Sequence, residues 1–243
     1  VEKIYGGIDL KEGGLGNGEV TTSTVEGRPI GSFWVYNVDG IFQTQSEVDN
    51  SPHVTGTLPG DFKYTDINDD GFIDERDRIY VGSYQPKFYY GINGGFNWKQ
   101  VDFSIDCYGN AGNKVYNGKK AVRFGNENIE ASRVDRWTTS NPSNVEYRAS
   151  NQIPKPSTYF VESGSFFRIN NVTLGYTLPA LAGLQNIISR TRFFVSAQNP
   201  LIWKKFSGFS PELPGSNALN SGIELSVYQT TANYMVGLNI NFK

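Results

Sequence analysis

The sequence predicts an all-β protein whose strands belong to an antiparallel transmembrane β-barrel with long loops at one end. Three observations carry this prediction. Large apolar residues alternate with small or polar ones over several stretches, which is the pattern of a strand with two different faces. Short and long links alternate along the chain. Aromatic residues, 14% of the chain, bracket the expected strands, as they do at the two membrane interfaces of such barrels.

The clearest strand covers residues 88–98, where the even positions are Phe, Tyr, Ile, Gly, Phe and Trp and the odd positions are mostly Gly and Asn. After Lys99-Gln100 the alternation resumes over residues 101–108, with Val, Phe, Ile and Cys on one side. We therefore expect a hairpin with a minimal turn at Lys99-Gln100.

The same alternation marks residues 166–178, 191–199 and 234–242. Within 166–178 the apolar side switches at Asn170-Asn171, which indicates a β-bulge. Residues 31–42 are expected to form one further strand upstream.

The links between these strands predict where the loops lie. Residues 99–100 and 179–190 are short links, whereas 43–87, 111–165 and 200–232 are long. Because successive antiparallel strands reverse direction, all three long links fall at one end. Outer-membrane barrels have this asymmetry, and soluble domains rarely carry several loops beyond about 12–15 residues. The alternative is a soluble, calcium-bearing β-sandwich that binds carbohydrate, which would explain the alternation but not the links.

Composition excludes several functions. The net charge is −2 and no run rich in Lys or Arg exists, so no nucleic-acid partner is expected. A single Cys (Cys107) and a single His (His53) leave no disulfide framework, no Cys-rich zinc site and no basis for a His-based triad. No apolar run reaches the length of a transmembrane helix. We predict no catalytic residue and expect the chain not to be an enzyme.

Residues 66–77, Asp-Ile-Asn-Asp-Asp-Gly-Phe-Ile-Asp-Glu-Arg-Asp, carry the sharpest chemical signal. Oxygen ligands fall at the positions of an EF-hand loop, with Gly71 at the sharp turn. The expected ligands are Asp66, Asn68, Asp70, the Phe72 carbonyl, Asp74 and Asp77. The ion would be Ca²⁺, with Mg²⁺ as the alternative, and no flanking helix is expected, so its role would be to clip a loop. The competing interpretation is an acidic surface turn without an ion.

Other residues are open to two interpretations. The loop aromatics Tyr116, Trp137, Tyr147 and Tyr159 would either stack on sugars or pack loops together, and the second is favoured. Asp102 and Asp106 lie two positions apart on one strand. They resemble a glycosidase pair, but solvated lining of a pore is the simpler explanation.

Several segments, in this order, resemble SusC-like TonB-dependent outer-membrane transporters of the SusC/RagA family. They are residues 26–33 (EGRPIGSF), 39–43 (DGIFQ), 59–64 (PGDFKY), the acidic loop with Asp77-Arg78, 86–88 (PKF), Arg136-Trp137 with Asn141-Pro142, 164–169 (GSFFRI), 171–176 (NVTLGY), 196–199 (SAQN) and 237–242 (GLNINF). The resemblance implies that residues 1–243 are the C-terminal portion of the barrel, supplying about six to eight strands. Residues 43–87, with the metal loop, and residues 111–165 and 200–232 would be its extracellular loops.

The resemblance also implies a function. It points to active import of an oligosaccharide or a peptide across the cell outer membrane. A SusD-like surface lipoprotein would cover the barrel, and outer-membrane lipid would surround it. The N-terminal barrel and plug portion, absent from this sequence, would complete the wall and engage TonB.

Overall fold

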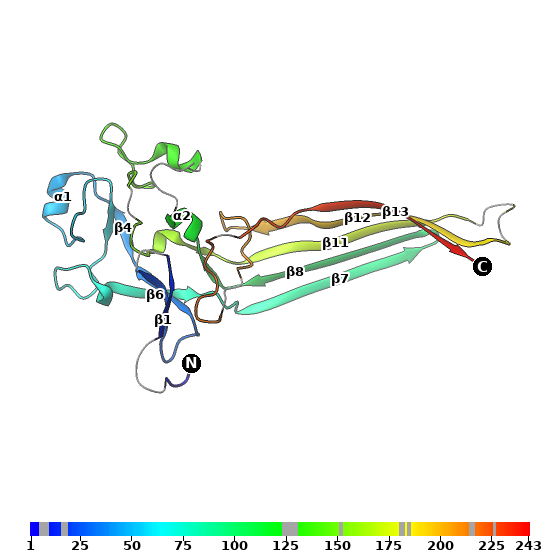
Figure 1. The fold of residues 1–243 in the computed structure, drawn as a ribbon, viewed down its shortest axis with the longest axis horizontal. Coiled ribbons are helices and arrows are strands. Elements are labelled where there is room, and N and C mark those ends of the chain that lie inside the picture. Colours follow the sequence, from blue (N-terminus) through cyan, green and yellow to red (C-terminus); the bar gives the residue numbers. More distant parts are fainter. Residues whose placement is uncertain are drawn as a thin grey trace. The chain divides into compact units, whose positions relative to one another are not determined.

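The structure is a computed structural model that describes residues 1–4, 10–15, 19–122, 131–150, 153–179, 183, 186–213, 217–225 and 227–243. The chain divides into two compact units, each assembled from three segments. Unit 1 comprises residues 1–85, 113–163 and 212–227, and unit 2 comprises residues 86–112, 164–211 and 228–243. Figure 1 traces the chain through both units.

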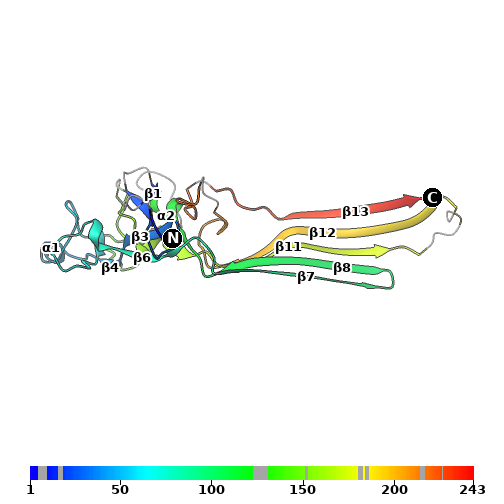
Figure 2. The same cartoon turned by 90° about the horizontal axis from the view of Figure 1, so that it is seen from below.

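Unit 2 is one long antiparallel sheet of five strands. The strands are β7 (Phe88–Trp98), β8 (Val101–Ala111), β11 (Phe166–Thr177), β12 (Ile188–Lys204) and β13 (Asn233–Phe242). Their order in the sheet is β13-β12-β11-β8-β7, so each strand of this unit pairs with the one that follows it in the chain (Figure 2). Within the described residues the sheet does not close, and β7 and β13 form its two edges.

The local features predicted for this sheet are confirmed. Lys99 and Gln100 join β7 to β8, with Trp98 paired with Val101. Lys99 has a φ of 53°, the left-handed conformation that a tight hairpin turn needs. The register of β11 shifts between Ile169 and Asn171, so the expected bulge is present. β12 is longer than the predicted stretch 191–199 at both ends, and residues 200–204, expected in a loop, belong to it.

The connections of unit 2 alternate as the sequence predicts. β8 ends at Ala111 beside the start of β11 at Phe166, and the long segment 112–165 joins them. β11 and β12 are joined at the opposite end by residues 178–187. Since β12 runs back to Lys204, the second long connection, 205–232, leaves from the same end as the first.

Unit 1 is a set of small sheets with short helices. Its elements are β1 (Leu10–Gly14), β2 (Val20–Thr24), β3 (Ser32–Tyr36), β4 (Val38–Ile41), α1 (Gln45–Asp49), β5 (Phe62–Tyr64), β6 (Arg78–Ser83), β9 (Lys114–Tyr116), α2 (Gly118–Val122), β10 (Val161–Ser163) and 3₁₀ turns at Glu75–Asp77, Ala131–Asp135 and Thr158–Phe160. The sheets are β1-β2-β3-β6, β4-β5 and β10-β9. None of the helices in the described residues is long and apolar enough to cross a membrane.

Unit 1 has an aromatic core of its own. Phe33, Tyr116 and Phe160 are fully buried. The Phe62 ring lies 4.5 Å from that of Tyr147 and the Phe160 ring 5.8 Å from that of Tyr116, measured between centroids. Such ring pairs add to the stabilisation from apolar burial. The segments predicted as long loops therefore fold around a core.

The single strand predicted over residues 31–42 is wrong. These residues form β3 and β4, which belong to different sheets of unit 1. Asn37 lies at the break, where its carbonyl accepts a hydrogen bond from the Thr65 amide at 3.0 Å. Among the described residues the long sheet therefore has five strands, against the about six to eight barrel strands that the resemblance implies.

Candidate functional site: the two-faced sheet and the acidic loop

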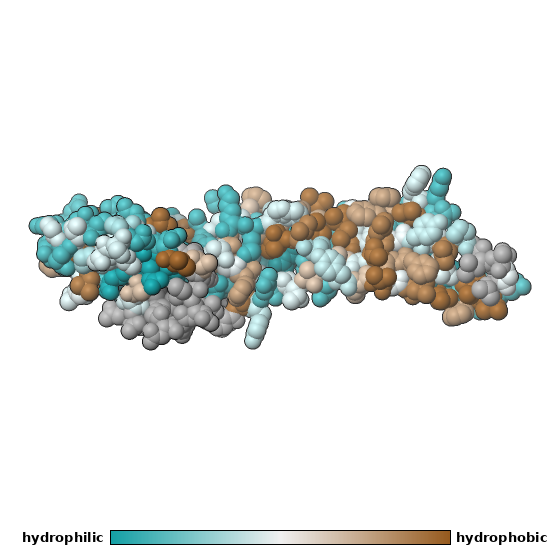
Figure 3. Space-filling view, turned by 90° about the horizontal axis from the view of Figure 1, so that it is seen from above, coloured by the Kyte–Doolittle hydropathy of each residue, from teal (hydrophilic) through white to brown (hydrophobic). Residues whose placement is uncertain are grey.

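One face of the unit 2 sheet is apolar and uncovered. The register aligns Leu174 with Phe103 on one side and Val195 on the other, and Val195 with Val236. Leu174 is 48% exposed, Val195 50% and Val236 84%. Figure 3 shows hydrophobic side chains spread over the part of the surface that the long strands form. A contiguous apolar surface of this kind marks a protein or membrane contact, and it does not fit the closed core of a soluble β-sandwich.

Aromatic residues form a row at each end of this apolar face. At the end from which the long connections leave, the Phe167 ring lies 6.2 Å from that of Tyr90 and 5.5 Å from that of Trp203. At the short-turn end, the rings of Phe96 and Phe103 lie 5.5 Å apart. Aliphatic residues such as Ile92, Ile105 and Val172 lie between the rows, at the pairing levels that separate Tyr90 from Phe96 along β7. Two aromatic girdles around an aliphatic band are the pattern of a barrel wall in a bilayer.

The opposite face of the sheet is polar and hydrogen-bonded. The Arg192 guanidinium on β12 donates from Nε to Asp102 Oδ1 on β8 at 2.8 Å. The amide of Asn170 donates to Asp106 Oδ2 at 2.8 Å. Asp102 and Asp106 therefore each have their own partner and do not share a proton site. Their positions agree with the interpretation of these carboxylates as part of a polar lining.

The acidic loop lies between β5 and β6 and is closed by its own hydrogen bonds. Asp77 is buried, and its carboxylate accepts from the amides of Ile67 at 2.9 Å and Asp74 at 2.7 Å. Asp66 Oδ2 accepts from the Gly71 amide at 2.7 Å. Gly71 has a φ of 86°, which fits the sharp turn expected there. Strands β5 and β6 flank the loop, whereas the sequence analysis expected only that no helix would.

An arginine neutralises part of this loop. Nη2 of Arg76 lies 2.6 Å from Asp70 Oδ2 and 2.7 Å from Asp74 Oδ2. Hydrogen bonds from Arg76 lower the pKa of the Asp74 carboxyl below its ordinary value, so this group stays charged. The Arg76 side chain is 65% exposed, so these ion pairs are weak.

The fit of this loop to a metal ion is partial. Among the described residues, no three or more His, Cys, Asp or Glu side chains are grouped so as to hold a metal. One feature does fit: Asp66 Oδ1 is buried and has no hydrogen-bond partner, and such an atom is costly unless something pairs with it. At the first ligand position, Asp66 thus has an unpaired acceptor oxygen. At the fifth and ninth positions, Asp70 and Asp74 form ion pairs with Arg76.

The loop aromatics pack unit 1 together, as the favoured interpretation holds. Tyr116 is 0% exposed, Tyr147 2% and Trp137 8%. The Trp137 indole donates to Gln43 Oε1 at 2.9 Å, and its ring faces Gly60, where a Cβ would come within 2.3 Å of it. Tyr159 is partly buried against the same core.

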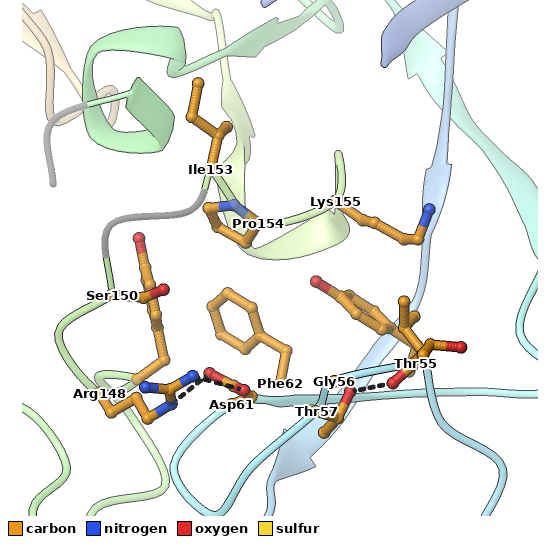
Figure 4. A pocket seen from close by; sticks show the side chains of 13 residues that line it. Thr55, Gly56, Thr57, Asp61, Phe62, Arg148, Ser150, Ile153, Pro154 and Lys155 are labelled. Atoms are coloured by element: carbon orange, nitrogen blue, oxygen red, sulfur yellow. Dashed lines mark hydrogen bonds and ion pairs between the residues drawn. The ribbon is translucent and has the colours of Figure 1, made fainter. Parts of the chain in front are cut away.

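Sequence reasoning missed a pocket in unit 1. Short segments within residues 54–64 and 147–155 line it, and Figure 4 shows Asp61, Phe62 and Arg148 at its floor and wall. The Asp61 and Arg148 side chains form a two-point ion pair, with distances of 2.7 and 3.0 Å. No local signal predicts this pair because the two residues are 87 positions apart.

Comparison with known proteins shows which proteins the chain is similar to. No family model matches it. It is 29% identical over 241 residues to TonB-dependent receptor P26 of Formosa agariphila, covering 94% of the chain and 24% of the relative. It is 28% identical over 233 residues to receptor P3 of the same organism, covering 89% and 22%. It is 26% identical over 183 residues to TonB-dependent receptor SusC of Bacteroides thetaiotaomicron, covering 74% and 17%. The chain is a homologue of SusC-like TonB-dependent receptors. It spans about a quarter or less of the length of these curated relatives.

Solved structures agree on the fold. The RagAB peptide transporter matches with a TM-score of 0.71 and 22% identity, covering 98% of this chain and 25% of that one. The RagAB peptide importer in the open-open state matches with a TM-score of 0.67 at the same identity and coverage. The five-stranded sheet therefore has the fold of a segment of a large antiparallel β-barrel, as predicted.

Proposed function

We propose that this chain forms part of the wall and the outer scaffold of a TonB-dependent transporter that imports a nutrient across the outer membrane. The observation that carries the proposal is the two-faced sheet. Its exposed aliphatic band lies between aromatic rows, and its other face holds the Asp102–Arg192 ion pair. Lipid would cover the first face and a water-filled interior the second. The chain acts as a structural part of a transporter and not as an enzyme.

The open edges indicate what completes the wall. β7 and β13 have no partner on their outer sides among the described residues. In hydrocarbon each unsatisfied backbone N–H or C=O costs several kcal/mol, so both edges must pair with other strands of the barrel. We propose that the N-terminal portion of the same receptor supplies these strands, and that TonB acts on that portion.

The long connections indicate the outer side. Both long connections between unit 2 strands leave from one sheet end, and in outer-membrane barrels the long loops are external. We propose that residues 43–87, 112–165 and 205–232 face the exterior, where a SusD-like lipoprotein would cover them. The relative named SusC and the solved RagAB peptide importer support this arrangement. The substrate would be an oligosaccharide or a peptide.

Cysteine labelling tests the wall in the full receptor in its native membrane. In a Cys107→Ser background, cysteine is placed at Leu174 on the apolar face or at its neighbour Thr173 on the polar face. A water-soluble maleimide should label Thr173→Cys at least tenfold faster than Leu174→Cys, since only the polar face meets water. Equal labelling of the two positions would refute the proposed orientation.

We also propose that the acidic loop binds Ca²⁺, or Mg²⁺ in its place. Asp66, Asn68, Asp70, the Phe72 carbonyl, Asp74 and Asp77 would be the ligands, and Arg76 would have to leave Asp70 and Asp74. A bound ion would supply the loop with a rigid clip, which offsets a backbone ordering cost of about 1–2 kcal/mol per residue. Chelation should then increase protease cleavage between Gly60 and Ile79. Cleavage that is the same with and without chelator would contradict the metal proposal.

A further inference from the structure

Two neighbouring strands of unit 2 enclose a hollow at the short-turn end of the sheet, where β12 begins and β13 ends. It is lined by Arg190 and Arg192 of β12 and by four residues of β13, and it holds about 640 Å³ of space that is open to solvent. Arg190 pairs with Asn241 and Arg192 with Asn239, so these four side chains share one face. It is the polar face of the sheet, because Arg192 reaches Asp102 there.

The hollow offers hydrogen-bond donors, and none of the residues that line it is acidic. In the described part of the chain, Arg190 is exposed and makes one side-chain hydrogen bond, from Nη2 to Thr177 Oγ1 at 3.1 Å, and no ion pair. A guanidinium has five N–H donors, so most of those of Arg190 remain available. Asn239 and Asn241 are exposed and add their side-chain amides. This set of donors fits the planar oxygens of a carboxylate.

The second arginine of the hollow is already neutralised. Arg192 donates from Nε to Asp102 Oδ1 at 2.8 Å and from Nη2 to the other oxygen of the same carboxylate. To do so it crosses β11 at Gly175, where a Cβ would clash with the guanidinium. Arg192 is therefore fixed in place by its own partner, and Arg190 carries the uncompensated positive charge of the hollow.

Apolar side chains lie beside the hollow on the same face. Phe194 pairs with Gly237, and its ring covers that glycine, since a Cβ there would clash with the ring. The Arg192 guanidinium lies 5.2 Å from the centroid of the Phe194 ring. Met235, which pairs with Ser196 at the next level of this face, is 50% exposed. Apolar surface on an otherwise polar face is favourable where another part of a protein covers it.

The position of the hollow indicates what fills it. Under the proposed function, on which this inference rests, the polar face lines the barrel interior, and the chain spans about a quarter or less of the length of its relatives. Any other part of the receptor that packs on this wall takes Arg190 out of water, and a buried cation is costly without a partner. A free anion would bind weakly, because exposed charges are screened. A protein carboxylate fits best.

We propose that the plug portion of the receptor places an Asp or Glu side chain in this hollow, with Arg190 as its main partner, and packs an apolar side chain on Phe194 and Met235. This contact holds the plug portion against β12 and β13 at the short-turn end of the wall. Arg190 is then a docking residue for another segment of the same receptor.

Hydrogen exchange on the detergent-purified full receptor tests the proposal with a matched pair of variants. Arg190→Gln and Lys99→Gln each remove one cation at the short-turn end, but Lys99 lies in the turn between β7 and β8 and does not line the hollow. Arg190→Gln should speed exchange about threefold or more in one plug segment that contains Asp or Glu, and Lys99→Gln should not. The proposal is overturned if no plug segment responds, if both variants act equally, or if the responding segment has no acidic residue.

Inorganic phosphate tests the competing occupant on the wild-type receptor, without any variant. If a plug carboxylate fills the hollow, replacing chloride by millimolar phosphate at constant ionic strength should leave exchange in residues 188–192 and 238–242 unchanged. Slower exchange of these segments in phosphate would show that the hollow is open to free anions, and would overturn the proposal.

A charge exchange then identifies the partner. Arg190→Glu should release the same plug segment, because it places two carboxylates together. Changing the acidic residue of that segment to Arg in the same receptor should return its exchange to near the wild-type rate. If no acidic residue of the segment restores protection in this way, the assigned ion pair is wrong.

Two results separate this inference from the proposed function. Nutrient uptake by a receptor whose plug portion is unaffected by Arg190→Gln would refute the docking residue and leave the transporter standing. Equal maleimide labelling at positions 173 and 174 would instead refute the orientation of the wall, and the inference with it.

Discussion

The two units of this chain are stabilised in different ways. Unit 1 buries Phe33, Tyr116 and Phe160 in a closed aromatic core, as a water-soluble domain does. Unit 2 leaves Leu174 and Val236 exposed and orders its polar residues through cross-strand hydrogen bonds such as Thr173 to Ser196 at 3.1 Å. One chain therefore contains a unit that buries its apolar side chains away from water and a unit that presents apolar side chains on its surface. Variants that remove apolar volume from the core should destabilise unit 1, whereas variants that add a charge to the apolar face should destabilise unit 2.

The largest effect is expected from Phe160→Ala. Phe160 is fully buried and its ring lies 5.0 Å from that of Tyr159, between centroids. Truncating a buried Phe to Ala costs about 3–5 kcal/mol. Hydrogen exchange should accelerate across residues 131–163 and stay unchanged in β7 and β8, with Phe160→Leu as the milder control. Equal acceleration in both units would show that they unfold together and would remove the distinction.

Leu174→Lys in the full receptor should have the next largest effect. A Lys on the lipid face costs a barrel up to about 2–4 kcal/mol, and the cost falls towards the membrane interfaces. Thr173→Lys, one residue away, faces the polar side and should cost less than half as much, because its charge stays hydrated. The folded fraction in membranes, measured by heat-modifiable gel mobility, compares the two. A larger loss for Thr173→Lys would mean that the lipid and the water sides have been exchanged.

The smallest effect is expected at the acidic loop on acidification. Because the folded-state pKa of Asp74 is depressed, its pair with Arg76 contributes stability above the ordinary Asp pKa of about 3.9 and loses it as the pH falls through the lower folded value. Protease cleavage of residues 66–77 should rise in this window in wild type. Arg76→Gln should flatten that rise, and an unchanged pH profile in this variant would argue against the pair.

The sequence predicts unit 2 much better than unit 1, and the reason is physical. Residues 88–98 and 101–108 reveal their strands because lipid on one side and water on the other impose a local period of two. Unit 1 depends on partners that no local pattern connects, such as Thr22 donating to the Leu219 carbonyl, 197 positions away. The division of residues 31–42 into β3 and β4 has the same origin, since Asn37 is held by Thr65.

The candidate sites follow the same rule. The ligand spacing of residues 66–77 can be read locally, and so can its sharp turn at Gly71. The pairing of Arg76 with Asp70 and Asp74 could have been predicted from the sequence, because all three residues lie in that loop. The Asp61–Arg148 pair could not have been predicted from the sequence, because it exists only after two segments that are distant in sequence have packed together.

The bulge in β11 has a consequence for the sheet as a whole. Ile169 of β11 pairs with Cys107 of β8, and Asn171 pairs with Asp106. Asn170 is therefore an extra residue in β11 with no matched partner in β8. A second irregularity lies at the same level between β11 and β12. Asn171 pairs with Gln198 and Ile169 with Leu201, so Asn199 and Pro200 of β12 have no matched partner. Asn199 has a φ of 51°. Extra residues at one level of adjacent strands bend a ribbon along a line. A bend of this kind is what a sheet needs in order to curve into the wall of a barrel.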